Sequence, residues 1–179
     1  MFAPIPGVAV IGFGHRARSG KDTAAAAIVK TIDGAQRFSF ADDLYAVARV
    51  MYGMTTKDAP LLQRIGVEAR DTDPDVWIRS VYFKMVEARP RLAVIPDVRF
   101  PNELAFVKAL GGITIKMSRF NADGALFVDP SRPADHISET ALQNAEWDHV
   151  IQAESGDTWT IGRQAEWYAR ALLHDELPA

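Results

Sequence analysis

Residues Val8–Thr23 read VAVIGFGHRARSGKDT: an apolar run, a loop that closes on Gly20-Lys21, and then the start of an alanine-rich helical segment. Proteins that hold nucleotide phosphates place a strand, a Gly-Lys loop and a helix in this order. Backbone N–H groups and the helix N-terminus attract the anion there, and the lysine reaches the outer phosphates. The segment therefore predicts a phosphate loop with a nucleoside triphosphate as its ligand.

The loop departs from the usual pattern G-x-x-x-x-G-K-[ST] at two positions. His15 stands where the first glycine is expected, one residue after Gly14, and Asp22 replaces the magnesium-binding Ser or Thr. A chance Gly-Lys in a turn is the alternative, but the flanking strand and helix argue against it. We expect Asp22 to hold magnesium through water, and Thr23 to give its hydroxyl to a phosphate or to the metal. The residues assigned to the loop are His15, Arg16, Ala17, Arg18, Ser19, Gly20, Lys21, Asp22 and Thr23.

Composition narrows the class of protein. At 179 residues, 48% hydrophobic and 24% charged, the chain is expected to form one domain with a substantial core. A net charge of −3 argues against binding to nucleic acid. The chain has no cysteine, which excludes disulfides and thiolate metal sites and fits a cytoplasmic protein. It has no apolar run long enough to span a membrane and no signal peptide at its start, so we expect no membrane contact. Monomer and homodimer both stay open.

Short apolar runs alternate with helical patterns along the chain. Near-continuous apolar strands between helices predict a doubly wound α/β fold, with a five-stranded parallel sheet covered by helices on both faces. The expected strands are 8–13, 37–40, 92–96, 113–117 and 149–152, and the expected helices are 22–32, 42–52, 59–70, 75–88, 101–110 and 158–173.

Two segments interrupt this alternation. Residues 42–88 insert helices between the second and third strands without a strand of their own. Residues 119–136 form a long connection that contains two prolines, several acids and two arginines. Long connections of this kind are often lids, and a disordered surface loop is the alternative.

The carboxyl ends of the strands are where ligands bind in such sheets. Asp97 follows the third apolar run, and it either holds magnesium through water or partners the N-terminus of the next helix. Arg99 either binds a phosphate with its guanidinium or forms an ion pair with Glu103. Asp42 and Asp43 follow the second run and either cap their helix or contact a sugar hydroxyl or a base.

Further candidates lie on the predicted helices. Arg64 and Arg70 share the polar side of one helix, where they either capture an acceptor phosphate or lie on a solvated face, with Arg64 pairing to Glu68. Trp77 has helical spacing to its apolar neighbours, which is typical of core, and base stacking is the alternative. Ser138 is expected to be a helix N-cap, and His136 a loop residue.

Taken together, these segments resemble the phage-type deoxynucleoside monophosphate kinases, a branch of the phosphate-loop kinases. The joint order of the segments is more specific than any one of them, and Asp97–Glu103 is the most specific piece. The matching segments are Arg16–Thr23 (RARSGKDT), Phe38–Asp42 (FSFAD), Leu61–Ile78 with Arg64, Glu68, Arg70 and Trp77, Asp97–Glu103 (DVRFPNE) and His136–Glu139 (HISE).

The resemblance implies a three-part enzyme that transfers the γ-phosphate of ATP to a deoxynucleoside monophosphate with Mg²⁺. On this analogy the nucleotide core is 1–41, 89–118 and 137–179, the helical monophosphate-binding insertion is 42–88, and the lid is 119–136. If the protein is phage-encoded, it would act in the host cytoplasm. The alternatives are a phosphate-loop kinase of another small molecule, and an ATP-binding regulatory module without an acceptor.

The resemblance also implies roles for single residues. It makes Arg119 and Arg132 lid arginines and places the turn 155–157 near the adenine. The implied catalytic residues are Lys21, Arg99 and Arg132, the substrate-binding residues are Asp42, Arg64, Arg70, Trp77, Arg99 and Arg119, and the metal-binding residues are Asp22, Thr23 and Asp97.

Overall fold

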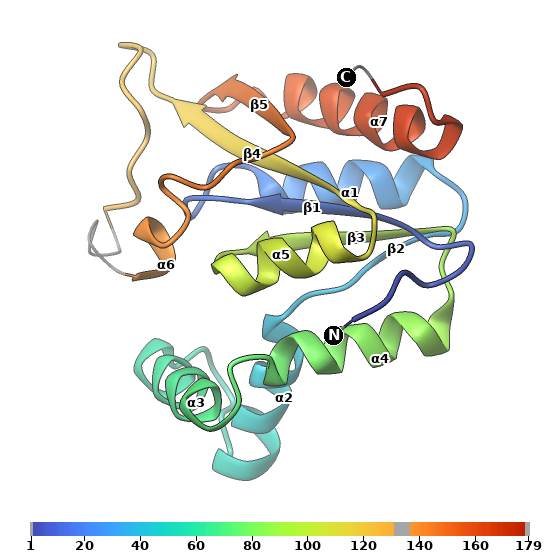
Figure 1. Ribbon diagram of the computed structural model, residues 1–179. Helices are drawn as coiled ribbons and strands as arrows, with labels where there is room; N and C mark the ends of the chain where they lie inside the picture. Colours follow the sequence, from blue (N-terminus) through green and yellow to red (C-terminus); the bar gives the residue numbers. More distant parts are fainter. Residues whose placement is uncertain (1, 131–136, 178–179) are drawn as a thin grey trace.

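The computed structural model describes residues 2–130 and 137–177 and has a five-stranded sheet at its centre (Figure 1). The strand order is β2-β3-β1-β4-β5, and every neighbouring pair is parallel. The predicted α/β class and the five-stranded parallel sheet are therefore confirmed. The strands are β1 (Ala9–Gly14), β2 (Ala35–Arg37), β3 (Leu92–Val98), β4 (Ile113–Phe120) and β5 (His149–Glu154).

Helices cover both faces of the sheet, as expected. In Figure 1, α1 and α7 lie side by side on one face, and α4 and α5 lie on the other. The six predicted helices all form, with ends within two residues of those expected. The helices are α1 (Lys21–Thr31), α2 (Ala41–Tyr52), α3 (Ala59–Thr72), α4 (Val76–Ala88), α5 (Pro101–Ala109), the short α6 (Ile137–Thr140) and α7 (Thr158–His174).

The strand sequences are apolar on both sides because the sheet has a core on each face. In β1, Val10 packs into the core under α4 and α5, and Ile11 packs into the core under α1 and α7. In β3, Ile95 packs into the core under α4 and α5, and Val94 packs into the core under α1 and α7. Both side chains are fully buried. Successive side chains of a strand point to opposite faces, so a strand covered on both sides needs apolar residues at every position.

The second strand differs from its expected position. It was predicted at 37–40 but spans Ala35–Arg37, so only Arg37 is shared. The backbone N–H of Phe38 still donates to Val94 of β3, and the chain then turns into α2. Phe38 and Phe40 are apolar because both are buried in the core, and their spacing resembles that of a strand.

The helical insertion 42–88 contains α2, α3 and α4, and it has no strand of its own. In Figure 1, α2 and α3 extend from the end of the sheet, and α4 returns along it. Leu62 and Ile65 of α3 are buried against the same core as Ala48 of α2. The insertion is therefore packed onto the core that α4 and α5 cover.

The described part of the long connection, residues 119–130, begins with regular structure. Its first residues continue β4 to Phe120, and a turn follows that is closed by an antiparallel bridge between Phe120 and Leu126. The N–H of Phe127 donates to the carbonyl of Arg119 at 2.8 Å. β4 therefore extends two residues into the segment assigned to the lid, and the lid itself stays a prediction. Arg132 and His136 lie outside the described residues.

Within the described ranges 2–130 and 137–177, none of the helices combines the length and the apolar character needed to cross a lipid bilayer.

Candidate functional site

A tight loop joins β1 to α1 at the carboxyl edge of the sheet. Three of its residues have positive φ angles, 88° at His15, 54° at Arg18 and 96° at Gly20, which is the left-handed region that favours glycine. His15 thus has the backbone conformation that the missing glycine of the pattern would provide. Just before the loop, a Cβ on Gly14 would lie 2.2 Å from the Trp147 ring and 2.5 Å from the Val98 carbonyl, so only glycine fits there.

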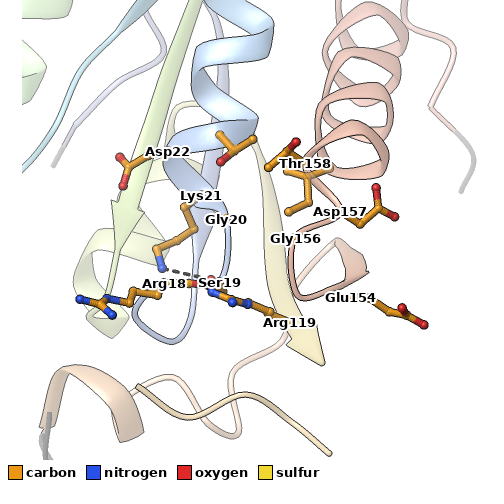
Figure 2. Close-up of a pocket in the computed structure, with 12 residues that line it drawn as sticks. Arg18, Ser19, Gly20, Lys21, Asp22, Arg119, Glu154, Gly156, Asp157 and Thr158 are labelled. Carbon is orange, nitrogen blue, oxygen red and sulfur yellow. Dashed lines mark hydrogen bonds between the residues drawn. The ribbon is translucent and has the colours of Figure 1, made fainter. Parts of the chain in front are cut away.

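Lys21 begins α1 and is buried, with 5% of its surface exposed. Its Nζ donates to Ser19 Oγ at 3.2 Å and to the carbonyl of Arg16, so the ammonium folds back into the loop (Figure 2). Burial, together with the positive charge of Arg99, lowers the pKa of Lys21 to about 8. A cation with few partners and a lowered pKa is the kind of group that an incoming anion stabilises.

His15 is also buried, and it is neutral at pH 7. Burial and the charges of Lys116, Arg16 and Lys21 lower its pKa to about 4. Its Nδ1 has no hydrogen-bond partner among the described residues. His15 therefore supports the base of the loop, and its side chain adds no charge to the site.

A pocket of about 330 Å³ opens beside the loop, within the size range of small-molecule sites. Figure 2 shows it between the start of α1 and the turn before α7. The pocket combines cationic groups near the loop with carboxylates near the turn. Its lining residues are Arg18, Ser19, Gly20, Lys21, Asp22, Thr23, Arg119, Glu154, Gly156, Asp157, Thr158 and Ile161.

Arg119 forms one wall of this pocket. Its Nε donates to Ser155 Oγ at 2.8 Å, its Nη1 donates to the Arg18 carbonyl at 3.2 Å, and its guanidinium lies 4.1 Å from the centre of the Phe127 ring. The end of β4 places Arg119 beside the loop, in the same pocket as the turn 155–157, which was expected to lie near the adenine. The predicted role of Arg119, a lid arginine that contacts the substrate, stays a prediction.

Asp97 holds the N-terminus of α2. Its carboxylate accepts hydrogen bonds from Ser39 Oγ at 2.6 Å, Phe40 N at 3.2 Å and Ala41 N at 3.1 Å. Asp97 is the penultimate residue of β3 and caps α2, whereas the sequence indicated the following helix, α5. Burial raises the pKa of Asp97, against these hydrogen bonds. Its predicted magnesium role stays a prediction.

Glu103 joins α3 to the end of β3. Its carboxylate accepts the backbone N–H groups of Arg99 at 2.7 Å and Phe100 at 3.1 Å, and it lies 3.7 Å from Nη2 of Arg70. The Arg70 guanidinium also stacks 4.4 Å from the centre of the Phe100 ring. Burial raises the pKa of Glu103 to about 7. The predicted pair of Arg99 and Glu103 side chains is therefore wrong, because Glu103 binds the Arg99 backbone and the Arg70 side chain.

The side chain of Arg99 points instead toward Glu139 of α6, with 4.0 Å between Nη1 and Oε1. The other oxygen of Glu139 accepts the backbone N–H of Ala17 at 2.9 Å. Arg18, the next residue of the loop, pairs with Asp129 at 3.3 Å. The loop is thus in contact with two carboxylates from the chain that follows β4.

Three predicted substrate contacts lie away from the loop. Arg64 is exposed on α3, and the described part of the chain shows no ion pair between it and Glu68. Asp42 is exposed in the first turn of α2 and pairs with Arg37 at 3.4 Å, so it does not cap the helix. Trp77, in the first turn of α4, is 6% exposed and packs in the core, which is the packing alternative.

Ser138 was expected to precede a helix, but α6 begins at Ile137, so Ser138 lies inside it. The short helix starts two residues earlier than the pattern indicated because Ile137 already accepts the N–H of Ala141. The N-cap assignment of Ser138 is therefore wrong.

Donors for a metal ion in the pocket are few. Across residues 2–130 and 137–177, no group of three or more His, Cys, Asp or Glu side chains could hold a metal ion. Asp22 and Thr23 do line the pocket next to Lys21. Magnesium in phosphate sites usually takes one or two carboxylates and completes its shell with water and phosphate oxygens. Asp22 and Thr23 therefore fit a magnesium ion that arrives with a polyphosphate, and they do not make a site for a free ion.

Some site residues escaped the sequence reasoning. Glu139 was part of a recognised segment but had no assigned role, and its contact with Ala17 spans 122 positions of the chain. Asp129 lay in the expected lid, without a partner assigned to it. Ser39 carried one usable signal, since a small hydroxyl residue two positions before an acidic first turn is typical of a helix start.

Comparison with known proteins gives no established activity. No family model matches the chain. Among curated proteins, the chain is similar to "Uncharacterized protein ORF77" of Ictalurid herpesvirus 1 (strain Auburn), with 31% identity over 137 residues. The matched region covers 74% of this chain and 58% of that protein, so the chain spans less than two thirds of its relative's length.

Proposed function

We propose that this protein is a phosphotransferase that binds ATP at the loop 15–23 and moves its γ-phosphate to a deoxynucleoside monophosphate. The observation that carries the proposal is the buried Lys21 ammonium at the start of α1, beside a pocket walled by the loop and Arg119. The charges of Glu139, Asp22 and Asp97 only partly offset the burial of this ammonium, whose pKa stays lowered, and a helix N-terminus adds to the attraction for phosphate. The acceptor rests on the resemblance of the sequence segments.

The transfer itself needs charge neutralisation and positioning. An oxygen of the acceptor phosphate would bond to the γ-phosphorus as the bond to the ADP oxygen breaks, which gives ADP and a deoxynucleoside diphosphate. Lys21 and the loop N–H groups would hold the phosphates of ATP. Arg99 lies close enough to Lys21 to lower its pKa, so its guanidinium is the candidate to hold the acceptor phosphate. The acceptor is already an anion, so no strong general base is required.

Magnesium would be held by Asp22 and Thr23, which line the pocket beside Lys21. When bound, the ion would supply positive charge to the phosphate oxygens. Arg119 and the turn 155–157 would contact the nucleoside end of ATP, because they form the opposite wall of the same pocket (Figure 2).

The test is coupled production of ADP from ATP and magnesium, run over the common deoxynucleoside and ribonucleoside monophosphates. We expect turnover with one or a few deoxynucleotides. Lys21→Ala should lower this turnover by at least about a thousandfold, since it removes a charge that stabilises the transferred group. Lys30→Ala is the matched control, because Lys30 is an exposed residue at the other end of α1.

Other outcomes would replace the proposal. Turnover that does not depend on the acceptor, or ATP binding without turnover, would indicate an ATP-binding regulatory module. Turnover only with an acceptor that is not a nucleotide would indicate a kinase of another small molecule. Equal rates in the wild type and in Lys21→Ala would contradict the phosphate loop itself.

A further inference from the structure

One backbone N–H of the loop is already bound to an anion from the protein itself. Ala17 N donates to Oε2 of Glu139 at 2.9 Å, and Glu139 is 8% exposed. In a phosphate loop the backbone N–H groups are the donors that receive phosphate oxygens. The carboxylate therefore takes a hydrogen bond that a phosphate would otherwise receive.

The charges around Glu139 are those that would attract a phosphate. Nη1 of Arg99 lies 4.0 Å from Oε1 of Glu139. Among the charges that raise the pKa of Lys21, that of Glu139 is the largest. One carboxylate thus faces a loop N–H, a guanidinium and an ammonium together, in a site that is largely closed to water.

A second carboxylate contacts the next residue of the loop. Oδ2 of Asp129 lies 3.3 Å from Nε of Arg18, and the Asp129 side chain is 4% exposed. Arg18 also lines the pocket. The Glu139 contact differs from this one because its donor is a backbone N–H, which cannot turn toward a ligand as the Arg18 side chain can.

We propose that Glu139 is an intramolecular competitor of phosphate, so that the Glu139–Ala17 contact and occupation of the loop by a polyphosphate exclude each other. Two anions in one poorly hydrated site repel each other strongly. An incoming polyphosphate therefore has to displace the Glu139 carboxylate, and α6 has to move with it. This inference rests on the proposed function, because it requires the loop to bind phosphate.

The test measures the binding of inorganic tripolyphosphate by calorimetry to the wild type, Glu139→Gln and Glu87→Gln. Glutamine keeps the size of Glu139 and can still accept the Ala17 N–H, but it carries no charge. We expect Glu139→Gln to bind tripolyphosphate about tenfold more tightly than the wild type, the effect of removing one close like charge. Glu87→Gln removes one charge from an exposed residue at the end of α4, and it should bind as the wild type does.

Glu139→Asp provides a second variant in case Glu139→Gln does not fold, which a thermal melt would show. It keeps the charge but withdraws the carboxylate by one methylene, so binding should again be tighter, by a smaller factor. Unchanged or weaker binding in the folded variants would overturn the inference, and weaker binding would make Glu139 a residue that positions the loop. Absence of tripolyphosphate binding in every variant, the wild type included, would instead refute the phosphate loop and the proposed function with it.

Discussion

The burial of Lys21 lowers the free energy of unfolding of the protein. The side chain is buried at the start of α1, and its pKa is about 8, against 10.5 for an ordinary lysine. The folded state therefore binds the Lys21 proton less tightly than the unfolded state does. Below pH 8 both states hold the proton, and the full cost, about 3 kcal/mol for a shift of this size, opposes folding. The cost shrinks as pH rises from 8 to 10.5.

Replacing Lys21 should accordingly stabilise the fold. We expect Lys21→Met to raise the free energy of unfolding at pH 7 by about 1–3 kcal/mol, because methionine fills similar space without a buried charge. Urea unfolding at pH 7 and pH 10 measures this change in the free energy of unfolding. The gain over the wild type should be smaller at pH 10, where the wild-type lysine is neutral in the folded state. A variant less stable than the wild type at pH 7 would show that the ammonium contributes more through its loop contacts than burial costs.

The residues of the site differ in whether the neighbouring sequence was enough to predict their positions. Gly20 and Lys21 were named from the motif, and the structure places both at the start of α1 beside the pocket. Arg119 was assigned to the long connection after the strand, and only the sheet register shows that it is still paired in β4. Glu139 was not predictable, because its contact with Ala17 depends on how the chain returns to the loop after β4.

At the scale of elements, Asp97 links β3 to α2. One carboxylate at the end of a central strand satisfies the hydroxyl of Ser39 and the N–H groups of Phe40 and Ala41. A helix N-terminus without such an acceptor leaves its first N–H groups unpaired. The start of the helical insertion is therefore fixed to the strand that also carries Arg99.

Removing this acceptor should loosen α2. We expect Asp97→Ala to lower the free energy of unfolding by about 2–3 kcal/mol, because it leaves buried donors unpaired and removes a helix cap. Ser39→Ala removes only one donor and should cost about 1 kcal/mol. Urea unfolding gives both values, with the exposed Asp33→Ala as the control. Equal stabilities for Asp97→Ala and Asp33→Ala would rule out the capping role.

Helices were easier to predict than strand ends, for a physical reason. The starts of α3 and α7 carry local caps, Asp58 and Asp157, whose side chains accept the N–H groups of Leu61 and Thr160. The end of β2 has a weaker local signal, the Ser39 hydroxyl two positions before α2. Phe38 and Phe40 are buried whether the chain continues as a strand or turns, so the distant Asp97 decides where α2 begins.

On the scale of the whole molecule, the parallel sheet brings remote segments to one edge. β1 lies between β3 and β4, so the loop after β1 has Asp97 and Arg99 on one side and Arg119 on the other. The strand order could not be read from the sequence, since alternating strands and helices fit several orders. The arrangement divides the charged groups into a pocket beside α7 and a cluster beside α3 and α6.

A ligand in that pocket should stabilise the entire fold. At ATP·Mg concentrations of about 100 times Kd, binding adds about 2.7 kcal/mol, which should raise Tm by about 5–10 °C for a chain of this length. A thermal shift assay measures the change. Lys30→Ala should keep the shift and Lys21→Ala should lose it. A shift of the same size in Lys21→Ala would place the nucleotide somewhere other than the loop.

The contact between Gly14 and Trp147 gives the loop an optical label of its own. The indole ring lies against the first turn out of β1, where even a methyl group on Gly14 would collide with it. Of the four tryptophans in the chain, Trp159 and Trp167 are exposed on α7, and Trp77 is buried in the core. With Trp159 and Trp167 replaced by phenylalanine, ultraviolet emission would come from the buried Trp77 and the half-buried Trp147. Because Trp147 touches the base of the loop, its emission would follow loop movement in real time, without any attached dye.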